Sequence, residues 1–156
     1  MTMKRLFIIL SLLILPLVSF AQMSDIEKVY GEYAGKDGYQ SYIYGKKMIS
    51  MMRENASPDV KKLLDGIETI RIISRTGDAH NLRTDAIEAL KKDYELISRI
   101  DENGESSMFY LYDNGNKRDN MSFVMINLTA DNCVILEIIG KFDVKDISKL
   151  SVIGKM

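Results

Sequence analysis

The sequence predicts an α+β domain with a mainly antiparallel sheet of five or six strands packed with helices, including a C-terminal four-stranded meander. Two observations support this fold class. In the second half of the chain, the turn signals Asn103-Gly104, Asn114-Gly115 and Ala130-Asp131-Asn132 separate four β-rich runs. In the first half, capping residues and apolar residues at helical spacing alternate with short β-rich runs.

The individual elements follow from caps, apolar spacing and flanking turns. Ser24 is a predicted N-cap, Glu27 completes a capping box with it, and Pro58 suits the first turn of a helix. The predicted helices cover residues 25–33, 46–53, 58–66, 79–93 and a last segment from the N-cap Asp143 through Leu150. The predicted strands cover residues 39–44, 68–74, 95–101, 108–113, 122–129 and 133–139.

Residues 1–21 have the pattern of a secretory signal peptide. Lys4 and Arg5 precede an apolar run, and the small residues Ser19 and Ala21 suit cleavage by a signal peptidase. The apolar run is shorter than the roughly 20 residues that span a bilayer. We therefore expect cleavage after Ala21, export to the periplasm or the medium, and no membrane span in the mature chain.

Residues 22–156 are expected to form one α+β domain. The whole chain has 21 basic and 22 acidic side chains, and the signal peptide contains two of the basic ones and no acid. The mature chain is therefore slightly acidic, and its charges are interspersed. Nucleic-acid binding calls for a basic patch, so no nucleic-acid partner is predicted.

The last two predicted strands have unequal faces, which constrains their pairing. One face is wholly apolar, with Val124, Ile126, Leu128, Val134, Leu136 and Ile138. Pairing apolar with apolar requires a connection of odd length, because a slip of one residue exchanges the faces. We predict a three-residue loop at residues 130–132, Leu128 opposite Val134, Met125 opposite Glu137, and helices over the apolar face.

The other, mixed face is the candidate partner-binding surface. It would combine aromatic rings with a few polar groups, as recognition surfaces do, in Tyr110, Tyr112, Met125, Asn127 and Glu137. The alternative is that a helix covers this face and that Glu137 lies at its rim or pairs with Arg99. A second candidate surface is the tyrosine-rich region with Tyr30, Tyr33, Tyr39, Tyr42 and Tyr44, which ordinary packing also explains.

No catalytic, cofactor-binding or metal-ligating residues are predicted. His80 is the only histidine and lies at a predicted helix start, where a solvated side chain is expected. Cys133 is the only cysteine and lies in an apolar run, which predicts a buried, unreactive thiol. The function expected is that of a non-catalytic module that binds another envelope protein. The alternatives are a small envelope hydrolase with carboxylate-based catalysis and a purely structural envelope protein.

Four segments carry a resemblance to a known family: residues 35–38 (Gly-Lys-Asp-Gly), 45–52, 94–97 and 136–143. With them the chain resembles a family of small secreted domains of unknown function, numbered 4252 and widespread in Bacteroidetes-type bacteria. The resemblance implies a Gram-negative envelope location and a link to envelope-stress or sigma-factor regulation. It implies no active residue.

Overall fold

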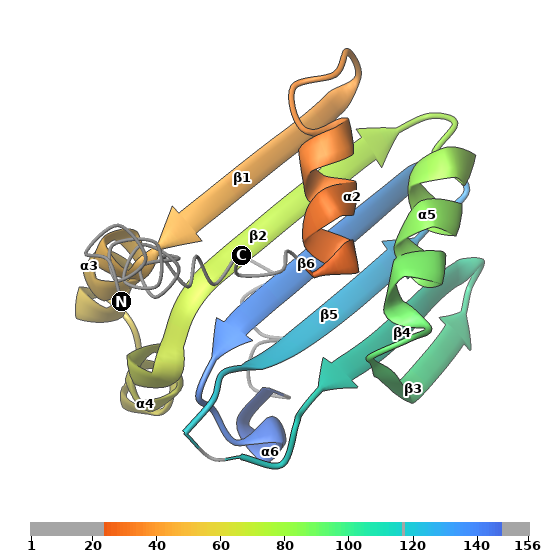
Figure 1. Ribbon diagram of the computed structural model, residues 1–156. Helices are drawn as coiled ribbons and strands as arrows, with labels where there is room; N and C mark the ends of the chain where they lie inside the picture. Colours follow the sequence, from red (N-terminus) through yellow and green to blue (C-terminus); the bar gives the residue numbers. More distant parts are fainter. Residues whose placement is uncertain (1–23, 117, 148–156) are drawn as a thin grey trace, which may run out of the picture.

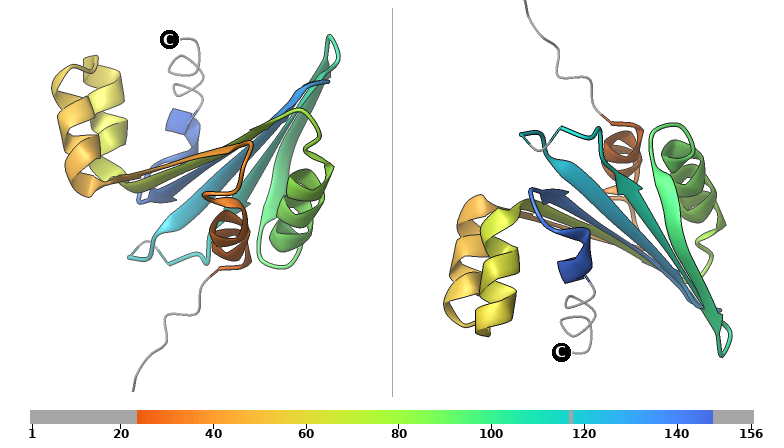
Figure 2. Two further views of the ribbon diagram at one scale, coloured as in Figure 1. Left: turned by 90° about the horizontal axis from the view of Figure 1, so that it is seen from above. Right: turned by 90° about the horizontal axis from the view of Figure 1, so that it is seen from below.

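The computed structural model describes residues 24–116 and 118–147, which form a six-stranded antiparallel sheet with helices on both faces (Figures 1 and 2). The spatial order of the strands is β1-β2-β6-β5-β4-β3. Their bounds are β1 (Tyr39–Gly45), β2 (Ile67–Thr76), β3 (Glu95–Glu102), β4 (Glu105–Tyr112), β5 (Met121–Leu128) and β6 (Asn132–Gly140). The predicted α+β class and the C-terminal meander of β3 to β6 are both confirmed.

Five helices lie in the described part of the chain: α2 (Asp25–Tyr33), α3 (Lys46–Glu54), α4 (Pro58–Gly66), α5 (His80–Leu90) and α6 (Val144–Ile147). The first begins as predicted, because the Ser24 hydroxyl accepts the Glu27 backbone N–H at 3.3 Å. The fourth ends at Leu90 and not at Asp93, since the Tyr94 N–H bonds the Leu90 carbonyl in a closing turn. The predicted extension of the last helix to Leu150 lies outside the described residues.

Two hydrophobic cores lie on opposite faces of the sheet. On the α2/α5 face, Ile26, Leu82 and Ala86 of the helices pack on Ile73, Val124, Ile126, Cys133 and Ile135 of the strands. On the α3/α4 face, Ile49, Leu63 and Leu64 pack with Ile67, Ile70, Phe123, Ile138 and Ile147. The sheet is therefore the shared middle layer of the fold. Helices pack on both of its faces, as the predicted alternative of a second covered face requires (Figure 2).

The register between β5 and β6 differs by one residue from the predicted one. Leu128 lies opposite Cys133, not Val134. The reason is the connection, because the Thr129 N–H bonds the Asn132 carbonyl at 2.9 Å and leaves a two-residue turn of even length. Since side chains alternate along a strand, this shift exchanges the two faces of β6 relative to β5.

The observed register makes both faces apolar. Met125 lies opposite Leu136 on the α3/α4 face, and Ile126 lies opposite Ile135 on the α2/α5 face. Glu137 then lies opposite Val124, beneath the helices. The predicted separation into an apolar and a mixed face is therefore replaced by two faces that each carry a hydrophobic core, with the Glu137 carboxylate buried on the α2/α5 face.

Two glycines allow β2 and β6 to approach closely at the end of their ladder. The Gly66 carbonyl accepts the Lys141 N–H at 2.7 Å. A Cβ on Gly140 would collide with that carbonyl oxygen and lie 2.8 Å from the Ile67 Cα. A side chain at this position therefore requires the backbone to move.

We expect Gly140→Ala to lower the free energy of unfolding by about 1–3 kcal/mol, the usual cost of overpacking. The matched control is Gly31→Ala in α2, where a Cβ meets nothing within 4 Å. That substitution should stabilise the protein by about 0.5–1 kcal/mol, because alanine loses less backbone entropy in a helix. Urea unfolding of both variants measures the difference, and equal effects would contradict the close approach.

Candidate functional site

The register divides the five residues predicted to form one partner-binding face. Tyr110 and Tyr112 share the α2/α5 face with Glu137, whereas Met125 and Asn127 point to the opposite face. Tyr110 is 8% exposed and Glu137 is 1% exposed. The structure therefore does not bring these residues together on one surface. The one-residue shift in β6 places Glu137 opposite Val124, and the β4–β5 register places Tyr110 opposite Val124 and not opposite Met125.

Glu137 is the centre of a buried polar cluster. Its carboxylate accepts the Ser122 hydroxyl at 2.8 Å and the Arg71 guanidinium (Nη1) at 3.0 Å. The predicted partner Arg99 pairs instead with Asp101 at 2.8 Å, at the exposed edge of the sheet. Arg71 lies directly opposite Glu137 on the neighbouring strand, so the ladder itself positions this ion pair.

The polar cluster links the sheet to α2 and to the segment that follows α5. Arg71 also donates from Nη2 to Glu27 of α2 at 2.9 Å. Tyr94 follows α5, and its hydroxyl donates to the Ser122 hydroxyl at 3.0 Å. The Tyr30 hydroxyl of α2 lies 3.3 Å from the Arg71 carbonyl. Helix α2 is therefore held over β2 and β6 by hydrogen bonds as well as by apolar packing.

Burial sets the proton affinities in this cluster. It raises the pKa of Glu137, while the hydrogen bonds from Ser122 and Arg71 oppose the rise. Burial also raises the pKa of Tyr94 to about 12. A carboxylate with satisfied oxygens and 1% exposure has no room for a substrate, so this cluster is structural.

The α3/α4 face has a different feature, a continuous apolar row across five strands. Each member lies directly opposite the next in the ladder: Tyr42, Ile72, Leu136, Met125 and Phe109. We call these five residues the apolar row. Tyr42 is 47% exposed, and the other four are partly exposed. Apolar side chains at neighbouring positions thus form a stripe at right angles to the strands.

The apolar row separates a covered part of this face from an open part. On one side lies the buried row of Ile70, Ile138 and Phe123, packed with α3, α4 and α6. On the other side lies a row that is polar except for Val134, and we call it the polar row. Its members are Gln40, Ser74, Val134, Asn127 and Ser107, and Asn127 donates to the Ser107 hydroxyl at 2.9 Å. Figure 2 shows α3, α4 and α6 gathered toward one end of the strands on this face, with no described helix over the other end. The row is therefore the boundary of the helical layer.

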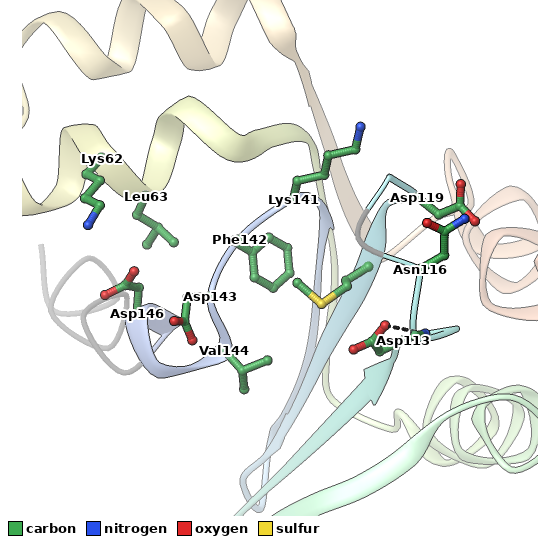
Figure 3. Close-up of a pocket in the computed structure, with 12 residues that line it drawn as sticks. Lys62, Leu63, Asp113, Asn116, Asp119, Lys141, Phe142, Asp143, Val144 and Asp146 are labelled. Atoms are coloured by element: carbon green, nitrogen blue, oxygen red, sulfur yellow. Dashed lines mark hydrogen bonds between the residues drawn. The ribbon is translucent and has the colours of Figure 1, made fainter.

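A pocket of about 650 Å³ lies at the covered end, between the β4–β5 loop, the start of α6 and α4 (Figure 3). Phe142 lies in the middle of the labelled side chains, with Asp143 and Asp113 on either side. These two carboxylates hold local turns: Asp113 accepts the Gly115 N–H at 2.8 Å, and Asp143 accepts the Lys145 N–H at 2.9 Å. Asp113 and Asp143 are therefore engaged in backbone turns, and Asp119, which also lines the pocket, accepts the Asn114 side-chain amide at 2.7 Å.

The remaining chemically versatile residues do not converge on this pocket or on each other. His80 is exposed at the start of α5, where its backbone N–H donates to the Asp78 carboxylate at 3.1 Å. Cys133 is buried, as predicted, and burial raises its pKa to about 11. Among residues 24–116 and 118–147, no three His, Cys, Asp or Glu side chains are placed to share a metal ion.

The tyrosine-rich region is mostly core. Tyr30 and Tyr33 lie on the buried side of α2, and the Tyr33 hydroxyl donates to Asp85 of α5 at 2.5 Å. Tyr42 and Tyr44 stack at 6.4 Å between ring centroids, and Tyr42 alone is largely exposed. Ordinary packing therefore explains four of the five rings, counting the partly exposed Tyr39 and Tyr44, and leaves Tyr42 at the edge of the sheet.

Sequence reasoning missed the apolar row, although each strand carried part of the signal. Ile70 and Ile72 alternate with polar residues, and Met125 and Leu136 lie within apolar runs. The wrong register placed Met125 opposite Glu137, which interrupted the row. A two-residue turn would have restored it, because Met125 then opposes Leu136.

None of the described helices is both long enough and apolar enough to cross a bilayer. The sequence profile of a family described as "Domain of unknown function (DUF4252)" matches residues 33–150. No curated protein matches the chain. The profile therefore covers the sheet and all described helices except most of α2.

We expect Arg71→Leu to destabilise the protein by about 3–5 kcal/mol at pH 7, because it leaves the Glu137 carboxylate buried without its cation. Burial already raises the pKa of Glu137, and loss of Arg71 raises it further. The folded variant therefore binds a proton more readily than the unfolded chain, so its deficit should shrink as the pH falls through the raised pKa.

Urea unfolding at pH 7 and pH 5 measures this effect. The matched control is the double variant Arg71→Leu/Glu137→Leu, which removes both charges and should recover much of the loss. A deficit that is independent of pH, or a double variant as unstable as the single one, would show that Glu137 is not the charge that Arg71 neutralises.

The Cys133 thiol should not react with a thiol reagent in the folded protein at pH 8, because it is buried and its pKa is raised to about 11. In denaturing urea it should react at the rate of a free cysteine. Absorbance of the released chromophore measures both rates. Rapid labelling of the folded protein would contradict the buried position.

Proposed function

The chain belongs to the DUF4252 family, and we propose that it is an exported, non-catalytic protein-binding domain whose partner lies along the apolar row of the α3/α4 face. The continuous row of Tyr42, Ile72, Leu136, Met125 and Phe109 is the observation that carries this proposal. Contiguous partly exposed apolar side chains beside a polar row are the features of a recognition surface. Two of the predicted partner-binding residues, Met125 and Asn127, belong to this surface.

The proposed occupant is an amphipathic helix of another envelope protein. The row crosses four gaps between strands, so it spans about 19 Å at a strand spacing of about 4.8 Å. A helix of about 13 residues has this length at 1.5 Å per residue. Its apolar stripe would cover Met125 and Leu136, and its polar side would meet Asn127 and Ser107, whose side chains are already hydrogen-bonded to each other.

The envelope location of the partner follows from the expected export of the chain. Lys4 and Arg5, the apolar run and Ala21 support a cleaved signal peptide. An exported domain meets periplasmic, outer-membrane or secreted proteins. A link to envelope signalling would then be exerted through the bound helix.

The hydrolase interpretation has less support. The Asp113 and Asp143 carboxylates of the pocket at the end of the sheet accept backbone N–H groups of their own turns. Glu137, the carboxylate with the least exposure, is bound by Ser122 and Arg71 and covered by α2. A pair of carboxylates for glycoside hydrolysis would instead flank an accessible bond.

A photocrosslinking amino acid at Met125 tests the proposal in the exported chain. We expect cross-links to one helical segment of one envelope protein, and the same segment from Phe109. The control position is His80, which is exposed on α5 at the opposite face and should capture nothing in common. Cross-links confined to residues 148–156 of the same chain, or to lipid, would overturn the proposal.

The captured partner then allows an affinity measurement. Met125→Glu places a charge in the apolar row and should weaken binding of the purified partner at least tenfold, which corresponds to about 1.4 kcal/mol. His80→Glu should leave the dissociation constant unchanged. Isothermal calorimetry measures both, with unfolding curves to show that each variant is folded. Equal affinities for the two variants would exclude the apolar row as the binding surface.

A further inference from the structure

The two edges of the sheet are protected to different extents. An edge strand presents unpaired backbone N–H and C=O groups, and proteins usually guard it with charges, bulges or a covering element. Strand β3 has such protection, because it carries Glu95, Arg99, Asp101 and Glu102 and its pairing with β4 shifts between Leu96 and Ser98. Strand β3 is therefore poorly suited to receive another strand.

Among the described residues, strand β1 has none of these guards. Its sequence, YQSYIYG, contains no charged residue, and its register with β2 runs without a shift from Tyr39 to Gly45. Ile43 is 68% exposed, the largest value among the exposed large apolar residues of the described chain. Figure 1 shows β1 at the margin of the sheet, with no described element along its outer side. This edge is therefore open to strand addition.

We propose that two copies of this chain pair antiparallel through β1, with Tyr42 of one copy opposite Tyr42 of the other, to form one continuous twelve-stranded sheet. A two-fold axis through the sheet relates the copies, so the same surface serves both partners. This proposal rests on β1 and not on the proposed helix-binding function.

The absence of charged residues in β1 favours a second copy of the same chain as the partner strand. When β1 pairs with β1 of a second copy, residues from the same short sequence lie opposite each other. Like charges that lie opposite each other would destabilise such a pair. With Tyr42 at the centre, Ile43 opposes Ser41 and Tyr44 opposes Gln40. No charge opposes a like charge within the strand, and an aromatic pair forms on the axis.

The choice of register follows from the faces of the sheet. Two-fold symmetry requires that residues of the same face oppose each other, so the opposing residue numbers must have the same parity. Tyr42 is the β1 member of the apolar row, opposite Ile72 on β2. Pairing Tyr42 with Tyr42 therefore joins the two apolar rows end to end on the α3/α4 face.

The ends of β1 are also complementary in this register. Lys47, just beyond one end of the strand, would lie near Asp37, just beyond the other end in the second copy. Helix α3 begins directly after Gly45, and its Met48 and Met51 are 45% and 57% exposed. These two side chains would lie near Tyr39 of the second copy and extend the apolar contact.

Sedimentation velocity of the exported chain tests self-association. We expect a dimer for the natural protein, and a dimer dissociation constant at least tenfold higher for Tyr42→Lys, which places two like charges on the axis. The matched control is Ile100→Lys on β3, where the side chain is similarly exposed at 52%. It should remain dimeric. A monomeric natural protein, or a Tyr42→Lys dimer as tight as the natural one, would overturn the proposal.

Disulfide cross-linking tests the register. Directly opposite Cα atoms in an antiparallel pair lie about 4.5–5.5 Å apart, within the range of a disulfide. Tyr42→Cys should therefore form a disulfide-linked dimer under mild oxidation, whereas Ile43→Cys and Ser41→Cys should cross-link with each other in a mixture and poorly with themselves. Efficient self-linking of Ile100→Cys, or none at Tyr42→Cys, would contradict β1 pairing. Absence of partner capture at Met125 would leave these outcomes unchanged.

Discussion

Arg71 and Glu137 form a buried ion pair between neighbouring strands, and the arrangement of β6 depends on it. The two residues lie directly opposite each other, and Glu137 also accepts the Ser122 hydroxyl from β5. A shift of β6 by one residue would turn the Glu137 carboxylate to the opposite face and leave Arg71 with Glu27 alone. A carboxylate that is buried and hydrogen-bonded to two strands thus specifies one register, because alternatives leave charges without partners.

The position of β6 determines what each face of the sheet offers. On the α2/α5 face, the ion pair fixes α2 through Glu27 and lets the apolar side chains of β5 and β6 meet beneath both helices. On the α3/α4 face, the same register aligns Leu136 between Ile72 and Met125. The buried polar cluster and the apolar row are therefore two consequences of one alignment, one on each side of the central strand.

The central strands of the sheet are paired on both sides, and its two edge strands differ in how well they are protected. The central strands are paired on both sides and carry the cores, whereas β1 and β3 each leave one side of the ladder unpaired. Charges and a bulge interrupt β3, while β1 is uncharged and regular. The apolar row reaches the sheet margin at Tyr42, so the surface of the α3/α4 face and the open edge meet at one residue.

The sequence by itself determined the elements, and the tertiary structure decided how they share faces. Ser24 with Glu27 defined the start of α2, and the turn signals between β3 and β6 defined the meander, because caps and turns depend on neighbouring residues. The burial of Cys133 also followed from its apolar run. The register of β6, the pairing of Glu137 with Arg71 and the alignment of the apolar row did not follow. They depend on contacts between residues far apart in the chain, and a turn shorter by one residue exchanges every side chain of the strand that follows it.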